Sequence, residues 1–388
     1  MTRIIYEATF QANEVLIMLD ILKISEGKLM AYEVKSSRAI SETYILDAAL
    51  QYYVMQKAGF KPEEFSIIYI NENYLLQDRL EIRDLFSIES VLDKIMPLQD
   101  FIEQQIRAEK ETLRLDHSPK IDIGRHCFTP YPCDFIGHCW KHLPERSVFD
   151  LSFLKFDERM SLYKRKINFP GEIKAEHLQN KIDHRRIQAV VQNALFLDCH
   201  AITELLRETG KSPVFLHVLS RRPAIPEYAG TRPYQAIPFG VGSISELNGQ
   251  EILHSAVFDK EADPFSQLLR YFQKLQKTDQ GILLYDQAFI EGMLQETFKR
   301  AGQDFQKDIP PLTDLAEAFK NFAVFQMGLD VSADLFSIAK HIFKEKPAGS
   351  IRSHIEAVVA YQRPGVKDEF EEIASFQAEN LEDFEKSL

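Results

Sequence analysis

Residues 15–37, VLIMLDILKISEGKLMAYEVKSS, decide the fold of the first part of the chain. Two runs rich in apolar side chains flank the short turn SEGK, which is typical of two antiparallel strands. Side chains alternate between the faces of a strand, so Glu33 and Lys35 share one face and Val34 takes the other. The pair is either a cross-strand ion pair on a solvated face or part of a functional site. The residues around it in the sequence distinguish these two interpretations.

The sequence on both sides of these strands predicts the order β-β-β-α-β. RIIYEATF, at residues 3–10, has the composition of a further strand, and FSIIYIN, at residues 65–71, has that of another. Between them, residues 41–59 carry apolar side chains at helical spacing. Ser41 can cap the start of this helix, and Gly59 marks its end.

Asp20 lies in the middle of the apolar run of the second strand. A carboxylate in a buried strand is costly unless it is paired or bound to a metal, and Glu33 and Lys35 on the neighbouring strand can supply that partner. Carboxylates that converge from adjacent strands hold Mg²⁺ or Mn²⁺, which polarises a phosphodiester and activates water. A lysine on the same face can orient that water or stabilise the charge on the phosphoryl oxygens.

The order LDI, YEVKSS and then a helix resembles the RecB-like branch of the PD-(D/E)XK nucleases. The resemblance implies a restriction-endonuclease-like α/β core in which Asp20 and Glu33 bind Mg²⁺ or Mn²⁺ and Lys35 is the catalytic lysine. Related nucleases carry a Gln and a Tyr one turn apart on the next helix, where this sequence has Asp47 and Gln51, which share a helix face. The alternative is that these two side chains only solvate the helix surface.

Three cysteines stand at equal intervals in GRHCFTPYPCDFIGHCWKHLPE, residues 124–145: Cys127, Cys133 and Cys139. Three interpretations remain open. RecB-like nucleases often close their domain with a 4Fe-4S cluster, and this run resembles its cysteine trio. The thiols can instead form a Cys₃His zinc site, or they can be unligated remnants of an ancestral site. The histidines available for a zinc site are His126, His138 and His142.

The fourth ligand of such a cluster lies, in related proteins, in a segment ahead of the first strand. This sequence lacks that segment before Ile4. Cys199 does not stand where the fourth ligand is expected, and its surroundings predict a buried helix cysteine. The expected cluster therefore has an incomplete ligand set.

Two longer stretches, at residues 133–151 and 221–244, resemble a bacterial family of unknown function. In that family a RecB-like nuclease carries a C-terminal ribonuclease-H-like exonuclease domain of the DEDD type. The resemblance implies a nuclease domain at residues 1–150, a helical linker at 151–210 and an α/β domain at 211–388. Strands are expected at 213–220, 236–245, 252–258 and 281–286, with a helix at 264–276.

The C-terminal domain is expected to have lost its exonuclease chemistry. The family's D-x-E motif, which holds two metal ions, falls on His217 to Leu219, and leucine has no lone pair for a hard cation. Ile290 and Asn380 stand where further acids are expected. Asp286 and Asp314 remain as isolated carboxylates, which are predicted to be surface or capping residues.

The formal net charge of −12 over 388 residues argues against a chain-wide electrostatic grip on nucleic acid and leaves room for a local basic groove. Five basic residues of the linker could contact phosphates or could form a solvated helix face. They are Lys164, Arg165, Lys166, Arg185 and Arg186. No apolar run approaches the ~18 residues of a membrane span, and the start lacks a signal peptide, so a cytoplasmic protein without a membrane partner is expected.

The sequence therefore predicts a metal-dependent DNA nuclease with an inactive C-terminal exonuclease-like domain. The resemblance implies DNA, single-stranded or with ends, as the partner, together with a helicase or a repair or defence protein. The alternative is a non-catalytic nucleic-acid-binding or scaffold remnant of such a nuclease.

Overall fold

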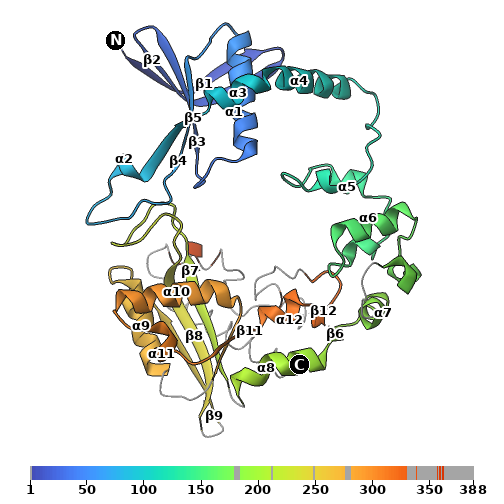
Figure 1. Cartoon of the computed structure of the whole chain (residues 1–388), viewed down its shortest axis with the longest axis vertical. Helices are drawn as coiled ribbons and strands as arrows, with labels where there is room; N and C mark the ends of the chain where they lie inside the picture. Colours follow the sequence, from blue (N-terminus) through green and yellow to red (C-terminus); the bar gives the residue numbers. More distant parts are fainter. Residues whose placement is uncertain are drawn as a thin grey trace. The chain divides into compact units, whose positions relative to one another are not determined.

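The computed structural model describes residues 2–178, 184–210, 213–247, 250–275 and 281–329, together with Ile338, Glu356, Val358, Val359 and Tyr361. The fold is mixed α/β (Figure 1). The chain divides into two compact units. The first unit comprises Met1–Cys133 and Arg222–Gln235, and the second comprises Asp134–Arg221 and Ala236–Leu388.

A five-stranded sheet in the order β1-β2-β3-β4-β5 forms the centre of the first unit. Neighbouring strands are antiparallel except β3 and β4, which are parallel and are joined through α1. The expected β-β-β-α-β order is confirmed. The strands are β1 (Arg3–Ala12), β2 (Val15–Ser25), β3 (Lys28–Lys35), β4 (Glu64–Ile70) and β5 (Phe86–Ser90), and the helices are α1 (Glu42–Lys57), α2 (Ile82–Leu85), α3 (Leu92–Ile95) and α4 (Gln99–Leu113).

Helix α1 has a defined start and end. The Ser41 hydroxyl accepts a hydrogen bond from the Tyr44 N–H, as an N-cap does. At the other end Gly59 takes a φ of +90°, and its N–H donates to the Gln56 carbonyl while the next N–H, of Phe60, donates to the Met55 carbonyl. This pair of bonds is a Schellman motif, which requires the left-handed conformation that glycine adopts at no steric cost.

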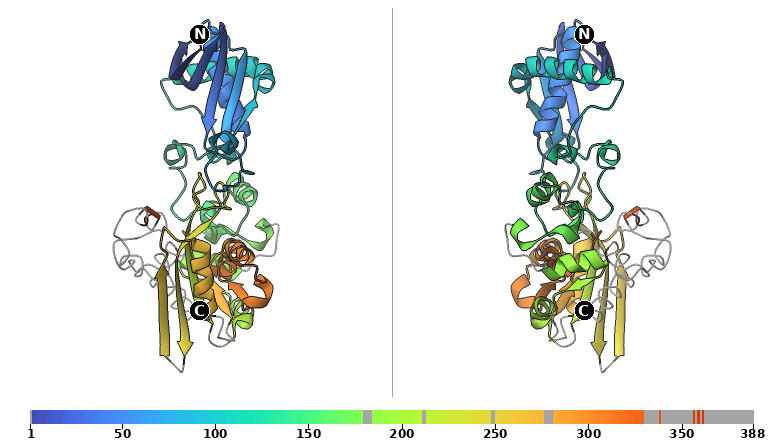
Figure 2. Two further views of the ribbon diagram at one scale, coloured as in Figure 1. Left: turned by 90° about the vertical axis from the view of Figure 1, so that its left-hand side faces the viewer. Right: turned by 90° about the vertical axis from the view of Figure 1, so that its right-hand side faces the viewer.

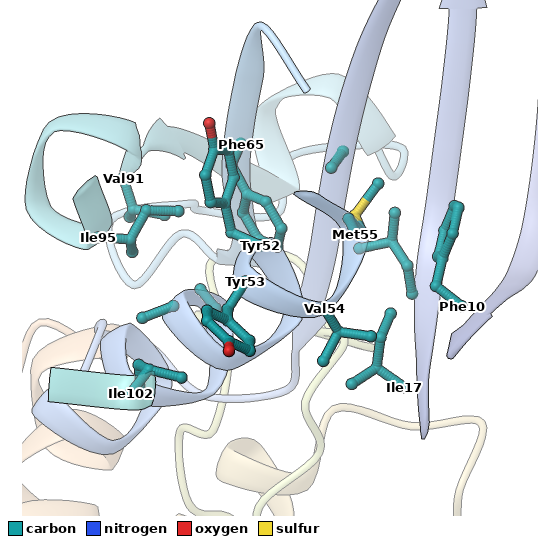
Figure 3. Packing of buried hydrophobic residues seen from close by; sticks show 14 of the residues in the cluster. Phe10, Ile17, Tyr52, Tyr53, Val54, Met55, Phe65, Val91, Ile95 and Ile102 are labelled. Atoms are coloured by element: carbon teal, nitrogen blue, oxygen red, sulfur yellow. The ribbon is translucent and has the colours of Figure 1, made fainter. Parts of the chain in front are cut away.

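Side chains of α1 fill the core between the sheet and helices α3 and α4. Figure 3 shows the helix residues between side chains of the strands and side chains of the two other helices. The labelled members of this cluster are Phe10, Ile17, Tyr52, Tyr53, Val54, Met55, Phe65, Val91, Ile95 and Ile102. On β2, buried Ile17 and Leu19 alternate with exposed Leu16 and Met18, so the helices cover one face of the β1–β2 part of the sheet.

The segment Arg222–Gln235 connects β7 to β8 in sequence and yet packs within the first unit. Two backbone hydrogen bonds hold it to residue 76: the Leu76 N–H donates to the Thr231 carbonyl, and the Gly230 N–H donates to the Leu76 carbonyl. Thr231 and Pro233 are buried. The first unit is therefore completed by a segment from the distant part of the chain.

The sheet of the second unit has the order β11-β10-β7-β8-β9. β7, β8 and β9 are antiparallel neighbours, whereas β10 runs parallel to both β7 and β11. α9 packs against β8, and α10 packs against α9 (Figures 1 and 2). The elements are β7 (Val214–Arg221), β8 (Ile237–Leu247), β9 (Gln250–Val257), α9 (Pro264–Leu275), β10 (Ile282–Leu284), α10 (Gln287–Arg300), α11 (Phe305–Asp308) and β11 (Leu312–Asp314). The expected strands and helix of this region are confirmed with small shifts of their ends.

The stretch expected to be a helical linker has a hydrophobic cluster of its own. It includes Leu151, Leu162, Ile187 and Phe196, and Phe325 from the later chain joins it. The elements here are α5 (Ile136–Cys139), α6 (Phe156–Lys164), α7 (His184–Gln192), β6 (Phe196–Leu197) and α8 (Cys199–Leu206), with α12 (Ala316–Lys320) and β12 (Val324–Phe325). β6 and β12 pair as a small antiparallel sheet, so this stretch is packed rather than extended.

Cys199 is exposed, and the expectation of a buried helix cysteine is wrong. It is the first residue of α8, where Asp198 caps the helix by accepting a hydrogen bond from the Ala201 N–H. The buried side of this helix is formed by Ile202. Cys199 lies in the first turn and outside this buried side, so its side chain faces solvent.

Within the described ranges, no helix combines the length and the apolar character needed to cross a membrane.

Replacing Gly59 by Ala is expected to lower the free energy of unfolding by ~1 kcal/mol, because an L-residue at this φ is strained. No atom lies within 4 Å of the position a Cβ would take, so the backbone conformation alone causes the loss. Gly292, on the exposed side of α10, also has open space around a Cβ, and Gly292→Ala is expected to stabilise by up to ~1 kcal/mol. Urea unfolding of both variants checks the opposite signs; a stabilising Gly59→Ala contradicts the assignment of the motif.

Candidate active site

Asp20 lies on β2 at the point where the ladder to β3 ends. The last residue pair of that ladder is Ile21 and Tyr32, so Asp20 is the next residue beyond it. Its Oδ2 accepts a hydrogen bond of 2.6 Å from the backbone N–H of Val34. The carboxylate thus takes the place of a strand partner and is brought to the end of β3, where its charge acts on Glu33.

Glu33 is a buried carboxylate, with 7% of its surface exposed. Burial raises its pKa above the ordinary value, Lys35 and Gln51 act in the opposite direction, and the charge of Asp20 adds to the rise. Its Oε1 accepts a hydrogen bond from Lys35, whereas its Oε2 is buried and has no hydrogen-bond partner among the described residues. A buried carboxylate oxygen without a hydrogen-bond partner costs free energy, so a ligand that binds to this atom would be stabilised there.

Lys35 connects the strand to the helix. Its Nζ lies 2.8 Å from Glu33 Oε1 and 2.7 Å from Asp47 Oδ2. Burial alone lowers the pKa of Lys35, but the hydrogen bonds and charges of Asp47 and Glu33 outweigh burial and hold the pKa above its ordinary value. The side chain is therefore an ammonium at neutral pH, which donates hydrogen bonds and does not act as a base.

Asp47 and Gln51 come from one face of α1, and the structure brings both to this group. Gln51 donates from Nε2 to Asp47 Oδ1 at 3.4 Å, and only 5% of its surface is exposed. The alternative that the two side chains merely solvate the helix does not describe this geometry. They hold Lys35 in place from the helix side.

The sequence did not point to Tyr44. Its ring lies under the Lys35 ammonium, with 5.3 Å from Nζ to the ring centroid. Tyr44 precedes Asp47 by three residues, so both lie on the face of α1 that meets Lys35. That spacing was the available signal, but aromatic side chains at helical spacing are common in cores and do not stand out.

The residues present fit a hard divalent cation in one respect. Asp20 and Glu33 offer carboxylate oxygens from neighbouring strands, and Glu33 Oε2 lacks another partner in the described chain. Nowhere in those ranges do three His, Cys, Asp or Glu side chains gather as a metal-holding group. Mg²⁺ commonly uses one or two protein carboxylates and completes its coordination with water and substrate phosphates, so two carboxylates are compatible with it.

The expected cysteine cluster is not formed by a group of three ligands in the described residues. Cys127 is buried and Cys133 is exposed, and a backbone hydrogen bond joins the Cys133 N–H to the Cys127 carbonyl. These two belong to the first unit, whereas Cys139 belongs to the second. The iron–sulfur and zinc interpretations therefore stay predictions.

The basic residues of the linker take two different positions. Lys164 and Arg165 are exposed at the end of α6. Lys166 lies over the Tyr163 ring at 6.0 Å from its centroid. Arg185 and Arg186 lie on α7, and each guanidinium covers the ring of the same phenylalanine.

That phenylalanine is Phe196, at 5.6 and 5.5 Å from the two guanidinium groups. Arg186 also lies 5.9 Å from the Phe322 ring and donates to the Asn321 carbonyl. Its head group therefore takes part in packing between α7 and the chain around Phe322. Arg186 is half-buried, whereas the other four basic residues are exposed.

At several positions of the second unit where an exonuclease would need metal-binding acids, the chain has apolar side chains or a carboxylate that is already paired. Leu219 is fully buried on β7, and Ile290 packs in the core between α9 and α10. His217 lies on β7, and Asn380 lies outside the described residues. Asp286 is exposed, as expected of a surface residue; it stands at the N-cap position of α10 in a left-handed conformation, and its side chain makes no cap bond.

Asp314 is buried, with 6% exposed, so the expectation of a surface residue is wrong for it, and the N-cap position of α12 is taken by Leu315. Its Oδ1 accepts from the backbone N–H groups of Asp286 and Ala316, and its Oδ2 lies 3.4 Å from Lys320 Nζ. These partners offset the burial of the charge. The carboxylate is committed to holding the loop after β10 against the end of β11.

Comparison with known protein families gives a match over part of the chain. No curated protein matches it. A family model described as Domain of unknown function (DUF2779) matches residues 214–351. The matched range begins at Val214, the first residue of β7, and includes all five strands of the second sheet and the segment Arg222–Gln235. The chain therefore contains a DUF2779 domain that starts at β7 and also contributes a segment to the first unit.

Proposed function

We propose that the first unit is a metal-dependent nuclease of the RecB-like PD-(D/E)XK class that hydrolyses DNA phosphodiesters. The observation that carries the proposal is the buried Glu33, which has one oxygen on the Lys35 ammonium and the other without a partner in the described chain. Asp20 stands beyond the last ladder pair on the adjacent strand. A buried acid with an open oxygen, a second acid and an ammonium is a costly arrangement for stability alone.

The residues of this site would divide the work as follows. Asp20 and Glu33 would hold Mg²⁺ or Mn²⁺, which when bound polarises the phosphodiester and lowers the pKa of a water molecule. Lys35, which is kept protonated, stabilises the negative charge that grows on the phosphoryl oxygens. Asp47 fixes the Lys35 ammonium, and Gln51 in turn fixes Asp47. This preorganisation avoids rearrangement during the reaction.

The DUF2779 domain is proposed to have a ribonuclease-H-like fold without exonuclease chemistry. A mixed five-stranded sheet with packed helices supports the fold. Leu219 and Ile290 are buried at the expected metal-ligand positions, and Asp314 is occupied by two N–H groups and Lys320. Its proposed contribution is to bind the DNA strand or to stabilise the chain.

The protein is expected to cleave DNA with Mg²⁺ or Mn²⁺ and to stop when EDTA removes the metal. Lys35→Ala should lower the cleavage rate ~10²–10³-fold, because one charged stabiliser of the transition state is lost. Gel assays of single-stranded and duplex DNA measure this effect. Lys94→Ala is the matched control, since Lys94 pairs with Glu89 at 2.7 Å on the surface of the same unit. Equal DNA cleavage rates for the wild type and Lys35→Ala would contradict the nuclease proposal.

The raised pKa of Glu33 predicts a pH-dependent stability of the metal-free protein. The folded state binds the Glu33 proton more readily than the unfolded chain, so the ionised carboxylate destabilises the fold at neutral pH. This destabilisation is relieved as the pH falls through the raised pKa toward the ordinary value of 4.5. Glu33→Gln is therefore expected to raise the melting temperature at pH 7 by ~2–4 °C, with a gain that shrinks toward acidic pH.

The same melting experiment includes a test of the metal. Mn²⁺ should raise the melting temperature of the wild type and leave that of Glu33→Gln nearly unchanged, because only the carboxylate binds the ion in the folded state. Glu89→Gln, at an exposed carboxylate, is the control and should behave as the wild type. If Mn²⁺ raises the melting temperature of Glu33→Gln as much as that of the wild type, Glu33 is not a metal ligand.

The double variant Asp20→Ala/Lys35→Ala is expected to show no trimming of end-labelled single strands with Mn²⁺, since the DUF2779 domain lacks paired metal ligands. Product ladders on denaturing gels measure this. Trimming by the double variant that disappears when Asp314→Asn is added would show that the second unit is a working exonuclease.

A further inference from the structure

Arg38 lies in the loop between β3 and α1, three residues after Lys35. It is exposed, and no carboxylate of the described chain lies within ion-pair distance of its guanidinium. Its sequence position places it just after the strand that carries Glu33 and Lys35, in a chain with a net charge of −12. The head group is thus available to an anion from outside.

Tyr234 keeps Arg38 in this position. The Tyr234 ring lies against the guanidinium, with 5.9 Å to its centroid, and the phenol hydroxyl donates a hydrogen bond to the backbone carbonyl of Ser36. Tyr234 is itself fixed, because its N–H donates to the Pro223 carbonyl at 2.8 Å. Stacking on an aromatic ring holds the guanidinium plane and leaves its edge open to hydrogen bonding.

The rest of the loop is ordered from the sheet and the helix. The Ile70 N–H, at the end of β4, donates to the Ser37 carbonyl at 3.0 Å, and Ser41 caps α1. Arg38 is therefore presented by a loop fixed at Ser36, Ser37 and Ser41. Preorganisation of this kind lowers the entropy cost of binding a ligand.

We infer that Arg38 binds a backbone phosphate of a single DNA strand next to the phosphodiester at the Asp20, Glu33 and Lys35 site, and that Tyr234 is its positioning residue. A guanidinium pairs with a phosphate through two parallel N–H···O bonds, which fixes the register of the strand. The inference rests on the proposed function and deepens it. It also gives the DUF2779 segment Arg222–Gln235 a task at the nuclease site.

The test is the affinity of the full chain for a labelled single-stranded oligonucleotide, measured by fluorescence anisotropy in EDTA over a range of NaCl concentrations. Arg38→Gln should weaken binding about tenfold and reduce the slope of log Kd against log salt by about 0.7, the contribution of one phosphate contact on a single strand. Arg38→Lys should keep the slope and lose part of the affinity, which separates a lost contact from misfolding. Arg83→Gln, at an exposed arginine of α2, is the control and should change neither quantity.

Tyr234 variants test the positioning role. Tyr234→Leu should weaken binding in the same direction and add nothing to Arg38→Gln, because it acts through Arg38, whereas Tyr234→Phe keeps the ring and should stay closer to the wild type. An Arg38→Gln variant with the affinity and slope of the wild type overturns the phosphate contact. Additive effects of Tyr234→Leu and Arg38→Gln overturn the positioning role.

Cleavage assays distinguish this inference from the proposed function. If Arg38→Gln binds DNA normally and cleavage depends on Lys35, the proposed nuclease function is supported and the proposed phosphate contact is contradicted. If Arg38→Gln binds DNA more weakly and the wild type does not cleave, the phosphate contact is supported and the proposed nuclease function is contradicted.

Discussion

The ammonium of Lys35, held between Glu33 of β3 and Asp47 of α1, is the interaction on which the arrangement of the first unit depends. Two carboxylates share this ammonium, so its charge is compensated from the strand and from the helix. The apolar core holds α1 against the sheet, but apolar contacts are non-directional. The ion pair adds a fixed direction: it requires the Asp47 and Gln51 side of the helix to meet the end of β3.

Much of this unit was predictable from the sequence because its signals are local. Alternation, the SEGK turn and the caps at Ser41 and Gly59 define the strands and α1 without reference to the rest of the chain. The burial of Gln51 and the Lys35–Asp47 pair could not be predicted with the same certainty. They depend on where the connection between two parallel strands places the helix, which is a tertiary property.

The segment Arg222–Gln235 shows the limit of such reasoning most clearly. Its prolines and tyrosines mark it as unusual, but no local signal assigns it to a unit whose other residues lie far earlier in the sequence. The pairing of Leu76 with Gly230 and Thr231 uses backbone groups, which any residue except proline offers. In the second unit, burial of Asp314 escaped prediction for a related reason, since its compensating donors are mostly backbone N–H groups.

The dependence of the first unit on Arg222–Gln235 has a consequence for biosynthesis. The ribosome completes the strands and helices of this unit by Cys133 and must add about a hundred further residues before the last part of the unit emerges. At translation rates of ~5–20 residues per second this interval lasts roughly 5 to 20 s, far longer than a small domain needs to fold. During that time the N–H and carbonyl of Leu76 and the surface that receives Thr231 and Pro233 stay open on the nascent chain. Maturation of the unit is therefore a late docking step, timed by synthesis of the downstream domain.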